Sequence, residues 1–291
     1  MRHGKYRFLA GAMALPLLLY GVFVLWPYVQ AFYLAFTDWN GLSSGAKFTG
    51  TENFTKLFSD PLFLAALRHN GLMLVAVPLG TIAIALFLSA ATQRTKVYRV
   101  VYFFPQLLSV AIIAVLWQFI YTPNSGLLNG LLRGIGLGSW AKSWLAEPNF
   151  ALIAVMVVMV WSAVGFYVVL FTAAMESIPG DIMEAALIDG ASPARIFWRI
   201  TVPLIWDSVQ VAFVYLGIAA LDGFALVQIM TVGPGGPDGS TEVMGLGLWR
   251  NAFTYGKFGY ACAMGVTIFF LTLSIAALFL KATKRDQVEL A

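Results

Sequence analysis

Charged side chains are scarce in this sequence, and their scarcity excludes the most common class of protein. Asp, Glu, Lys and Arg make up 11% of the 291 residues, whereas a soluble globular domain carries about 25%. Hydrophobic residues reach 60%, and the mean hydropathy is +0.81. So few charges do not suit the surface of a water-soluble domain, and we therefore expect lipid to surround most of the chain.

The groups that carry most enzyme and redox chemistry are also nearly absent. Cys262 is the single cysteine, which rules out a disulfide within the chain, and we expect it to be a packed small residue. His3 and His69 are the only histidines, and neither has a second ligand at metal spacing. The sequence has no H-E-x-x-H pair and no G-x-x-x-x-G-K-[ST] phosphate loop. It predicts no catalytic residue, no metal site and no cofactor bound by this chain.

Long apolar runs are what the sequence has in quantity. The hydrocarbon core of a bilayer is about 30 Å thick, and one helical crossing takes about 20 apolar residues. Six segments are long enough, which predicts an all-α polytopic membrane protein with six transmembrane helices in a single domain, residues 1–291. The predicted spans are residues 8–36, 71–91, 100–121, 150–175, 203–232 and 258–280. Pro16 and Pro27 are expected to bend the first of them.

Lys and Arg are unequally distributed between the two sides that these spans define. Eleven of the 18 lie at the termini or in the connections after the second and fourth spans. Because cytoplasmic loops retain positive charge, both termini and residues 181–201 are placed in the cytoplasm. The longest polar connections, residues 37–70 and 122–149, are then outside. Trp140 and Trp144 indicate an interfacial segment in the second of these connections, since Trp favours the headgroup zone.

The cytoplasmic connection between the fourth and fifth spans has a compact helical pattern. Residues 181–188 predict a short helix with an acidic first turn, and Gly190 permits the left-handed backbone that ends it. Ser192 caps a second short helix, Pro193 fits its first turn, and Pro203 is expected to end it. Two short helices joined at a glycine form an exposed elbow, which suits a groove on another protein.

The elbow carries a motif that resembles a known family. In this sequence the motif reads Glu184-Ala185-Ala186, three residues, Gly190, nine residues, and Ile200-Thr201-Val202-Pro203. It resembles the EAA loop of binding-protein-dependent ABC importer permeases. That pattern is E-A-A, three residues, G, nine residues, I-x-L-P, and Val202 stands where leucine is usual. The ATPase-coupling residues that the resemblance implies are Glu184, Ala185, Ala186, Asp189, Gly190, Arg195, Ile200 and Pro203.

The resemblance extends over nearly the whole chain. Its further motifs are Asp38-Trp39, Asp60-Pro61 with Phe63 and Ala66, Ile178-Pro179, and Gly235-Gly236-Pro237 with Ser240-Thr241-Glu242. The last cluster is similar to the carbohydrate-uptake branch, and within it to the first permease of a heterodimeric pair, as in maltose-type and glycerol-3-phosphate-type systems.

The resemblance implies a non-catalytic permease subunit in a bacterial inner membrane. Its implied partners are a second permease subunit, an ATPase dimer that binds ATP and Mg, and an external solute-binding protein that delivers a sugar or oligosaccharide. We expect Ala185, Ala186, Ile188 and Phe197 to be available for burial against the ATPase, and Glu184 with Arg195 or Arg199 to fix its orientation.

Two other functions stay open at this point. A glycerol-3-phosphate or polyol importer is one, although the spans contain no central Lys or Arg for a phosphate. An ion-coupled secondary transporter is the other; such a protein has paired acids in its spans and inverted repeats, and Asp222 alone makes a poor coupling site.

The solute pathway is expected in the fourth and fifth spans. Asp222 is an ionisable residue within an apolar run and therefore a functional candidate; alternatively, it caps a helix break or pairs with a neighbouring subunit. In maltose-type permeases the helices on either side of the EAA loop line the solute site, and the resemblance transfers this role by distance from the elbow. The substrate-pathway candidates are Ser162, Phe166, Leu216, Ala219, Asp222 and Gly223. Small residues in the fifth span also permit close helix packing.

Overall fold

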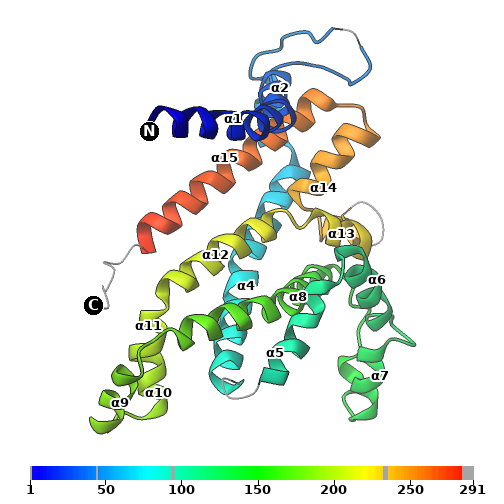
Figure 1. Ribbon diagram of the computed structural model, residues 1–291. Helices are drawn as coiled ribbons and strands as arrows, with labels where there is room; N and C mark the ends of the chain where they lie inside the picture. The colour runs from blue at the N-terminus through cyan, green and yellow to red at the C-terminus, as the bar shows by residue number, and fades with distance from the viewer. Residues whose placement is uncertain (1, 44, 93–95, 232–234, 284–291) are drawn as a thin grey trace. The chain divides into compact units, whose positions relative to one another are not determined.

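The computed structural model describes residues 2–43, 45–92, 96–231 and 235–283. These residues form helices and connections, with one isolated β-bridge between Thr37 and Phe48. The all-helical fold expected from the sequence is therefore confirmed (Figure 1). The chain divides into two compact units: unit 1 comprises Met1–Phe63 and Gly247–Leu271, and unit 2 comprises Leu64–Leu246 and Thr272–Ala291. The single domain over residues 1–291 stays a prediction.

Unit 1 contains the first apolar helix and the N-terminal half of the last one. Its elements are α1 (Arg2–Tyr20), η1 (Gly21–Leu25), α2 (Trp26–Leu34), α3 (Glu52–Ser59), the start of α4 (Pro61–Thr92), the end of α14 (Met244–Trp249), η6 (Arg250–Thr254) and the first part of α15 (Phe258–Thr283). Ala35, Ala263 and Val266 form its small core, and Phe32 and Phe36 pack against them.

Unit 2 contains the elements that position the candidate site. Besides most of α4 they are α5 (Lys96–Phe103), η2 (Phe104–Leu107), α6 (Val110–Ile120), α7 (Leu127–Gly134), η3 (Gly138–Trp140), α8 (Pro148–Glu176), α9 (Gly180–Ile188), α10 (Pro193–Ile196), η4 (Phe197–Thr201), α11 (Val202–Leu204), α12 (Trp206–Leu221), α13 (Phe224–Met230) and η5 (Pro237–Gly239). Helix α5 lies along α8, and α6 lies along α13 (Figure 1).

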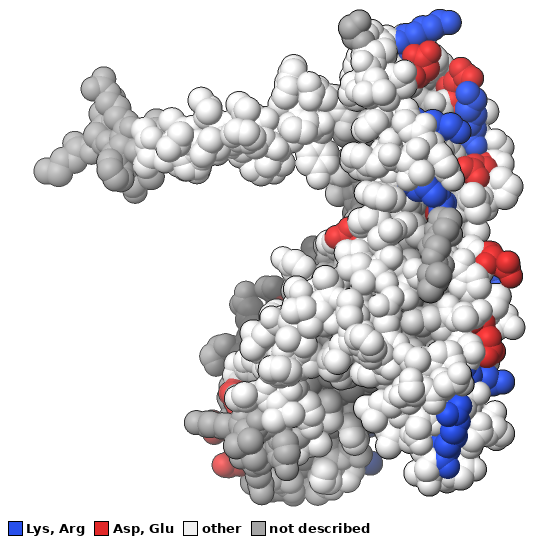
Figure 2. All heavy atoms as spheres, turned by 90° about the vertical axis from the view of Figure 1, so that its right-hand side faces the viewer, with Lys and Arg blue, Asp and Glu red and all other residues white. Residues whose placement is uncertain are grey.

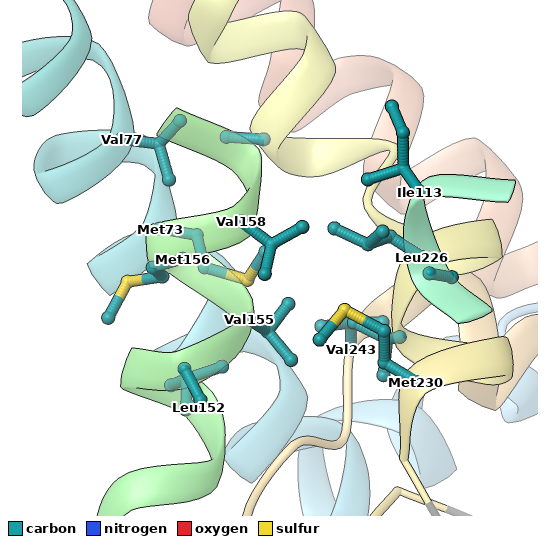
Figure 3. Packing of buried hydrophobic residues seen from close by; sticks show 14 of the residues in the cluster. Met73, Val77, Ile113, Leu152, Val155, Met156, Val158, Leu226, Met230 and Val243 are labelled. Carbon is teal, nitrogen blue, oxygen red and sulfur yellow. The ribbon is translucent and has the colours of Figure 1, made fainter. Parts of the chain in front are cut away.

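Helix α8 is the centre of the packing in unit 2, because its sequence is apolar around the whole circumference. In Figure 3 its residues Val155 and Val158 point toward Leu226 and Met230 of α13, while Met73 of α4 lies on its other side. A second cluster surrounds Val168 and Phe171 farther along the same helix. Both clusters therefore fix α4, α6, α12 and α13 to α8.

Four predicted spans contain continuous apolar helices in the structure, and two are broken. The continuous ones are Gly11–Leu34, Pro61–Ala91, Pro148–Glu176 and Phe258–Thr283. The third predicted span bends by 106° between Val100–Leu107 and Val110–Ile120. In the region of the fifth, Pro193–Leu204 and Trp206–Leu221 meet at 70°. The chain thus has four to six candidate spans among its described residues, and the predicted end of the fifth, residue 232, lies outside them.

The second apolar helix begins ten residues earlier than the hydropathy indicated. Pro61 is its first residue, and the Asp60 carboxylate accepts a hydrogen bond from the backbone N–H of Leu62 at 2.9 Å. A cap of this kind satisfies one of the unpaired N–H groups at a helix start. The polar residues Arg68, His69 and Asn70, which the sequence analysis assigned to the preceding connection, are therefore helical.

Of the prolines inside helical segments, Pro27 and Pro203 each follow a wider helical turn. The π-turn η1 ends with the Trp26 N–H donating to the Gly21 carbonyl, just before Pro27, and η4 ends with the Val202 N–H donating to the Phe197 carbonyl, just before Pro203. A π-turn reroutes hydrogen bonds where proline has no N–H to donate. The expectation that Pro203 ends its helix is wrong, since the helix continues to Leu204 and bends at Ile205.

Much of the surface is apolar, as a lipid environment requires. Uncharged residues form most of the face shown in Figure 2, where Lys, Arg, Asp and Glu occupy few positions. Within the span Gly11–Leu34, the most apolar stretch has no buried residue. Exposed apolar area of this extent indicates contact with a membrane or another protein.

A glycine determines how closely α5 approaches α8. A side-chain carbon on Gly165 would overlap the Tyr102 carbonyl, whereas one on Gly71 of α4 would meet no atom within 4 Å. We expect Gly165→Ala to lower the free energy of unfolding by about 1–3 kcal/mol, while Gly71→Ala leaves it unchanged or raises it. Thermal midpoints of the two purified variants in the same detergent test this, and equal midpoints would contradict the packing.

Candidate functional site

The elbow between α8 and α12 is stabilised by a motif at the end of α9. The Gly190 N–H donates to the Leu187 carbonyl, and the Ala191 N–H donates to the Ala186 carbonyl, both at 3.0 Å. This pair of bonds is the Schellman arrangement, which satisfies carbonyls at a helix end and requires a left-handed residue. Gly190 has φ +71° and supplies it. The turn chemistry predicted from the sequence is present.

The second helix of the elbow also starts as the sequence predicted. The Ser192 hydroxyl oxygen accepts a hydrogen bond from the Arg195 backbone N–H at 3.4 Å, and Pro193 occupies the first turn. Figure 1 shows α9 and α10 at one end of unit 2, with α12 running from them toward α13. The elbow is therefore a hydrogen-bonded projection at the end of α12.

Most predicted coupling residues lie on the elbow's exposed surface. Those that are exposed are Glu184, Ala185, Asp189, Gly190, Arg195 and Pro203, while Ile200 is half-buried. Ile188 is 86% exposed. The exposed apolar residues Leu187 and Trp198 extend this surface and were missed by the sequence analysis, although large apolar residues in a segment placed outside lipid were a usable signal.

Two residues expected to be free for a partner already pack within the chain. Ala186 is only 7% exposed, and Phe197 packs against the cluster around Phe171. The expectation that both are available for burial against an ATPase is therefore wrong. The physical reason is that Phe197 attaches the elbow to the core cluster around Phe171, while Ala186 is covered within the chain.

The charged groups of the elbow have no ion-pair partner among the described residues. They are Asp181, Glu184, Asp189, Arg195 and Arg199, all exposed. An exposed set of both signs, held on a rigid turn, leaves every charge available to complementary groups on another protein.

A second feature of unit 2 is a cavity of about 490 Å³ beside α8 and α12. Its walls come from α4, η2, α6, α8, α12 and the break before α13. All six predicted substrate-pathway residues line it: Ser162, Phe166, Leu216, Ala219, Asp222 and Gly223. The size lies within the usual range for small-molecule sites, about 300–1,000 Å³. Residues chosen by their distance from the elbow thus line one common cavity.

Asp222 lies in the interruption between α12 and α13. Its N–H donates to the Ile218 carbonyl at 3.0 Å, and its carbonyl accepts from the Phe224 N–H at 2.6 Å. Its side chain is exposed to the cavity and has no hydrogen-bond partner among the described residues. The backbone of Asp222 therefore caps the helix, and its carboxylate remains available to a ligand.

Aromatic and polar groups complete the cavity wall. Tyr215 is 66% exposed and Phe166 is 44% exposed, so both present ring area to the space they line. Ser162 donates to the Met159 carbonyl at 2.9 Å and keeps its oxygen as an acceptor. Gln106 also lines the cavity. The sequence analysis missed it because an unbroken third span would not place it there.

Two amides, that of buried Asn70 and that of half-buried Gln118, satisfy backbone groups at the helix break and at the end of α13. The Asn70 amide nitrogen donates to the carbonyls of Ala220 and Leu221, each at 3.2 Å, and its oxygen accepts from the Met244 N–H at 2.8 Å. In α6 the Gln118 amide nitrogen donates to the carbonyl of Ile229 at 2.5 Å, near the end of α13. Non-helical backbone at membrane depth requires partners of this kind.

A protein-family profile matches residues 76–285, which cover both the cavity and the elbow. The family is described as the binding-protein-dependent transport system inner membrane component. The match leaves out most of unit 1 and includes nearly all of unit 2.

Individual relatives match nearly the whole chain. The diacetylchitobiose uptake system permease protein of Streptomyces coelicolor is 45% identical over 93% of this chain and 80% of its own. The multiple sugar-binding transport system permease protein of Streptococcus mutans is 30% identical over 95% of both chains. A chain in the crystal structure of a bacterial ABC transporter involved in the import of the acidic polysaccharide alginate superimposes with a TM-score of 0.82 at 22% identity, covering 97% of each chain. This last likeness concerns the fold.

The role of Asn70 can be tested against an exposed amide. Asn70→Leu keeps the size of the side chain but leaves two carbonyls and one N–H without their partner, and each unsatisfied buried group costs about 1–3 kcal/mol. Gln228→Leu makes the same change on an exposed residue of α13. We expect a clear fall in the thermal midpoint only for Asn70→Leu; a comparable fall for both variants, or for neither, would refute the assignment.

Proposed function

The chain belongs to the family of binding-protein-dependent transport system inner membrane components, and we propose that it is the first permease subunit of an ATP-driven importer of a neutral oligosaccharide. One observation carries the proposal. The two helices that flank the elbow, α8 and α12, contribute eight of the eighteen residues that line the cavity, more than any other pair of elements. Movement of the elbow would therefore move the cavity walls directly.

The elbow is proposed to dock a dimer of ATPase subunits that bind ATP and Mg. The chain itself has no phosphate-binding loop in its sequence. The exposed Ile188, Leu187 and Trp198 supply apolar contacts, and the unpaired charges of the elbow fix the orientation. The Schellman turn and the packing of Phe197 against the cluster around Phe171 make the elbow stiff. Closure of the ATPase dimer would then rotate α8 and α12 as rigid bodies, opening the cavity alternately to the two sides.

The charge distribution supports the orientation of this arrangement. Lys and Arg are concentrated at the termini and in the connections that share their side, which supports a cytoplasmic location for the termini and the elbow of a protein in a bacterial inner membrane. A solute-binding protein would then dock at the opposite connections. A second permease subunit would complete the pathway, because large apolar residues such as Val115, Phe119 and Ile153 are exposed on unit 2.

The cavity chemistry favours a neutral sugar. Asp222 is the single charged residue among those that line it, and no Lys or Arg is among them. A carboxylate and a serine oxygen accept hydrogen bonds from sugar hydroxyls, while Phe166 and Tyr215 provide faces for apolar sugar surfaces. A phosphorylated solute such as glycerol-3-phosphate would meet repulsion from Asp222. The names of the Streptomyces and Streptococcus relatives, which concern sugar uptake, support the same class.

The elbow's role is tested at Gly190 with a matched substitution. Nothing lies within 4 Å of a side-chain carbon at this position, so the backbone conformation alone opposes a substitution. Gly190→Val would force a branched residue into the left-handed region at a cost of about 1–2 kcal/mol, whereas asparagine adopts that region readily. We expect Gly190→Val, but not Gly190→Asn, to lose co-purification with the ATPase subunits; retained complex formation by Gly190→Val would contradict the docking role.

The cavity's role is tested by removing its carboxylate. Asp222→Ala should reduce uptake of labelled diacetylchitobiose about tenfold, since a hydrogen bond to a charged group contributes about 1.5–3 kcal/mol. Asp207→Ala removes an exposed carboxylate from the first turn of α12, outside the cavity. Uptake by this control should stay at the wild-type rate. Equal uptake by both variants would argue against a solute contact at Asp222.

A further inference from the structure

Unit 1 contains a pocket of its own, with a volume of about 710 Å³. It is formed by the segment after α2, by α3 and by the segment that joins η6 to α15. Asp38-Trp39 and Asp60 line it, and neither the elbow nor the cavity of unit 2 uses these motifs. The charge distribution places the same segments on the outer side of the membrane.

The pocket wall is held in place by the chain's own hydrogen bonds. The Trp39 carbonyl accepts from the Gly259 N–H at 2.9 Å, and a side chain on Gly259 would overlap the Thr37 carbonyl. The Asp60 carboxylate accepts from the Tyr260 hydroxyl at 2.8 Å. The two segments that form the pocket are thus joined at two points. A wall ordered without a ligand lowers the entropic cost of binding one.

Several polar groups in the pocket keep unused hydrogen-bonding capacity. One oxygen of Asp38 accepts from the Lys47 N–H at 2.9 Å, and the other has no partner. The Asn40 oxygen accepts from Leu42 and Ser43, which leaves its amide donors free, and the Asn251 amide is used while its oxygen is free. Acceptors and donors in one pocket match hydroxyl groups, because each hydroxyl both donates and accepts.

Aromatic rings occupy the same pocket. Trp39, Tyr255 and Tyr260 all line it. Trp39 packs against Phe258 at 5.5 Å between ring centroids, which fixes its orientation, and remains half-buried. Aromatic rings combine a large apolar face with a defined geometry, and a few polar groups among such faces are typical of small-molecule sites.

The charges of the pocket disfavour an anionic ligand. Lys56 is paired with Glu52 at 2.7 Å, so its charge is balanced. Lys257 lies over the Tyr255 ring at 5.8 Å, and the lining also contains two carboxylates, Asp38 and Asp60. The pocket therefore has no excess of positive charge that would attract a phosphate or an acidic sugar.

From these features we propose that the pocket of unit 1 is a second binding site for a neutral saccharide, distinct from the cavity of unit 2. The proposal rests on the proposed transport function. Trp39 supplies the stacking face, and Asp38, Asn40 and Asn251 supply the hydrogen bonds to hydroxyl groups. The site gives the importer a saccharide contact on its outer side that does not depend on the helix break at Asp222.

Equilibrium binding of labelled diacetylchitobiose to the purified importer complex in nanodiscs, without the solute-binding protein, tests this. We expect two classes of site in the wild type. Trp39→Ala should weaken one of them about tenfold. Asp38→Asn should weaken binding to the same class of site. This substitution keeps a side-chain oxygen that can accept from the Lys47 N–H and replaces the other carboxylate oxygen with an amide, so its effect is independent of Trp39 packing. Tyr33→Ala, which removes an exposed aromatic of α2 outside the pocket, should leave both classes unchanged.

The outcomes separate this proposal from the transport function. If Asp222→Ala removes all binding and the pocket variants change nothing, the second site is refuted and the cavity assignment stands. If the pocket variants remove one class and Asp222→Ala removes none, the second site stands and the cavity assignment falls. No saturable binding to the wild type refutes both. If Trp39→Ala leaves sugar binding intact but abolishes co-purification with the solute-binding protein, the pocket is a protein-docking surface and the proposal is wrong.

Discussion

The pairing of every backbone N–H and carbonyl inside an apolar environment is the constraint on which this structure depends. A helix meets it without help, but the helices around the cavity are interrupted, and each interruption has a specific remedy. Asn70 reaches from α4 to carbonyls just before the Asp222 break, and Gln118 reaches from α6 to a carbonyl at the end of α13. Wider turns precede Pro27 and Pro203. The buried amides of Asn53 and Asn70 are among the groups that satisfy backbone carbonyls where the helical hydrogen-bond pattern ends.

This constraint connects the cavity to the elbow. The Asp222 carboxylate reaches the cavity because α12 stops at Leu221. The free-energy cost of this stop is low because the Asn70 amide donates a hydrogen bond to the Leu221 carbonyl in place of the missing backbone N–H. At its other end the same helix follows the elbow, whose shape is fixed by the left-handed Gly190. One helix thus begins at the exposed elbow and ends at a carboxylate that lines the cavity, which is the arrangement that the proposed transport function needs.

Much of this organisation follows from sequence patterns with a direct physical meaning. Apolar length identified the helices, and the glycine and serine of the elbow identified its turn and cap. The helix interruptions were harder to predict, because hydropathy carries no information on the direction of the chain. Residues 100–121 are mostly apolar, yet the chain bends at Ser109, whose hydroxyl oxygen caps α6 by accepting a hydrogen bond from the Ile112 N–H. Likewise, the polar residues 68–70 interrupt the hydropathy signal without interrupting α4. Gln106 reaches the cavity only through the bend, so no linear pattern would have assigned it.

The first apolar helix has a consequence for how the protein is made. Phe32 near its end contacts Phe269 and Phe270 of α15, but the most apolar window of Gly11–Leu34 has no buried residue. A segment with so few contacts of its own needs no later part of the chain to become stable in lipid. This helix can therefore enter the lipid bilayer as soon as it is synthesised and pack against other helices later. Membrane insertion can thus begin before the rest of the chain has been made.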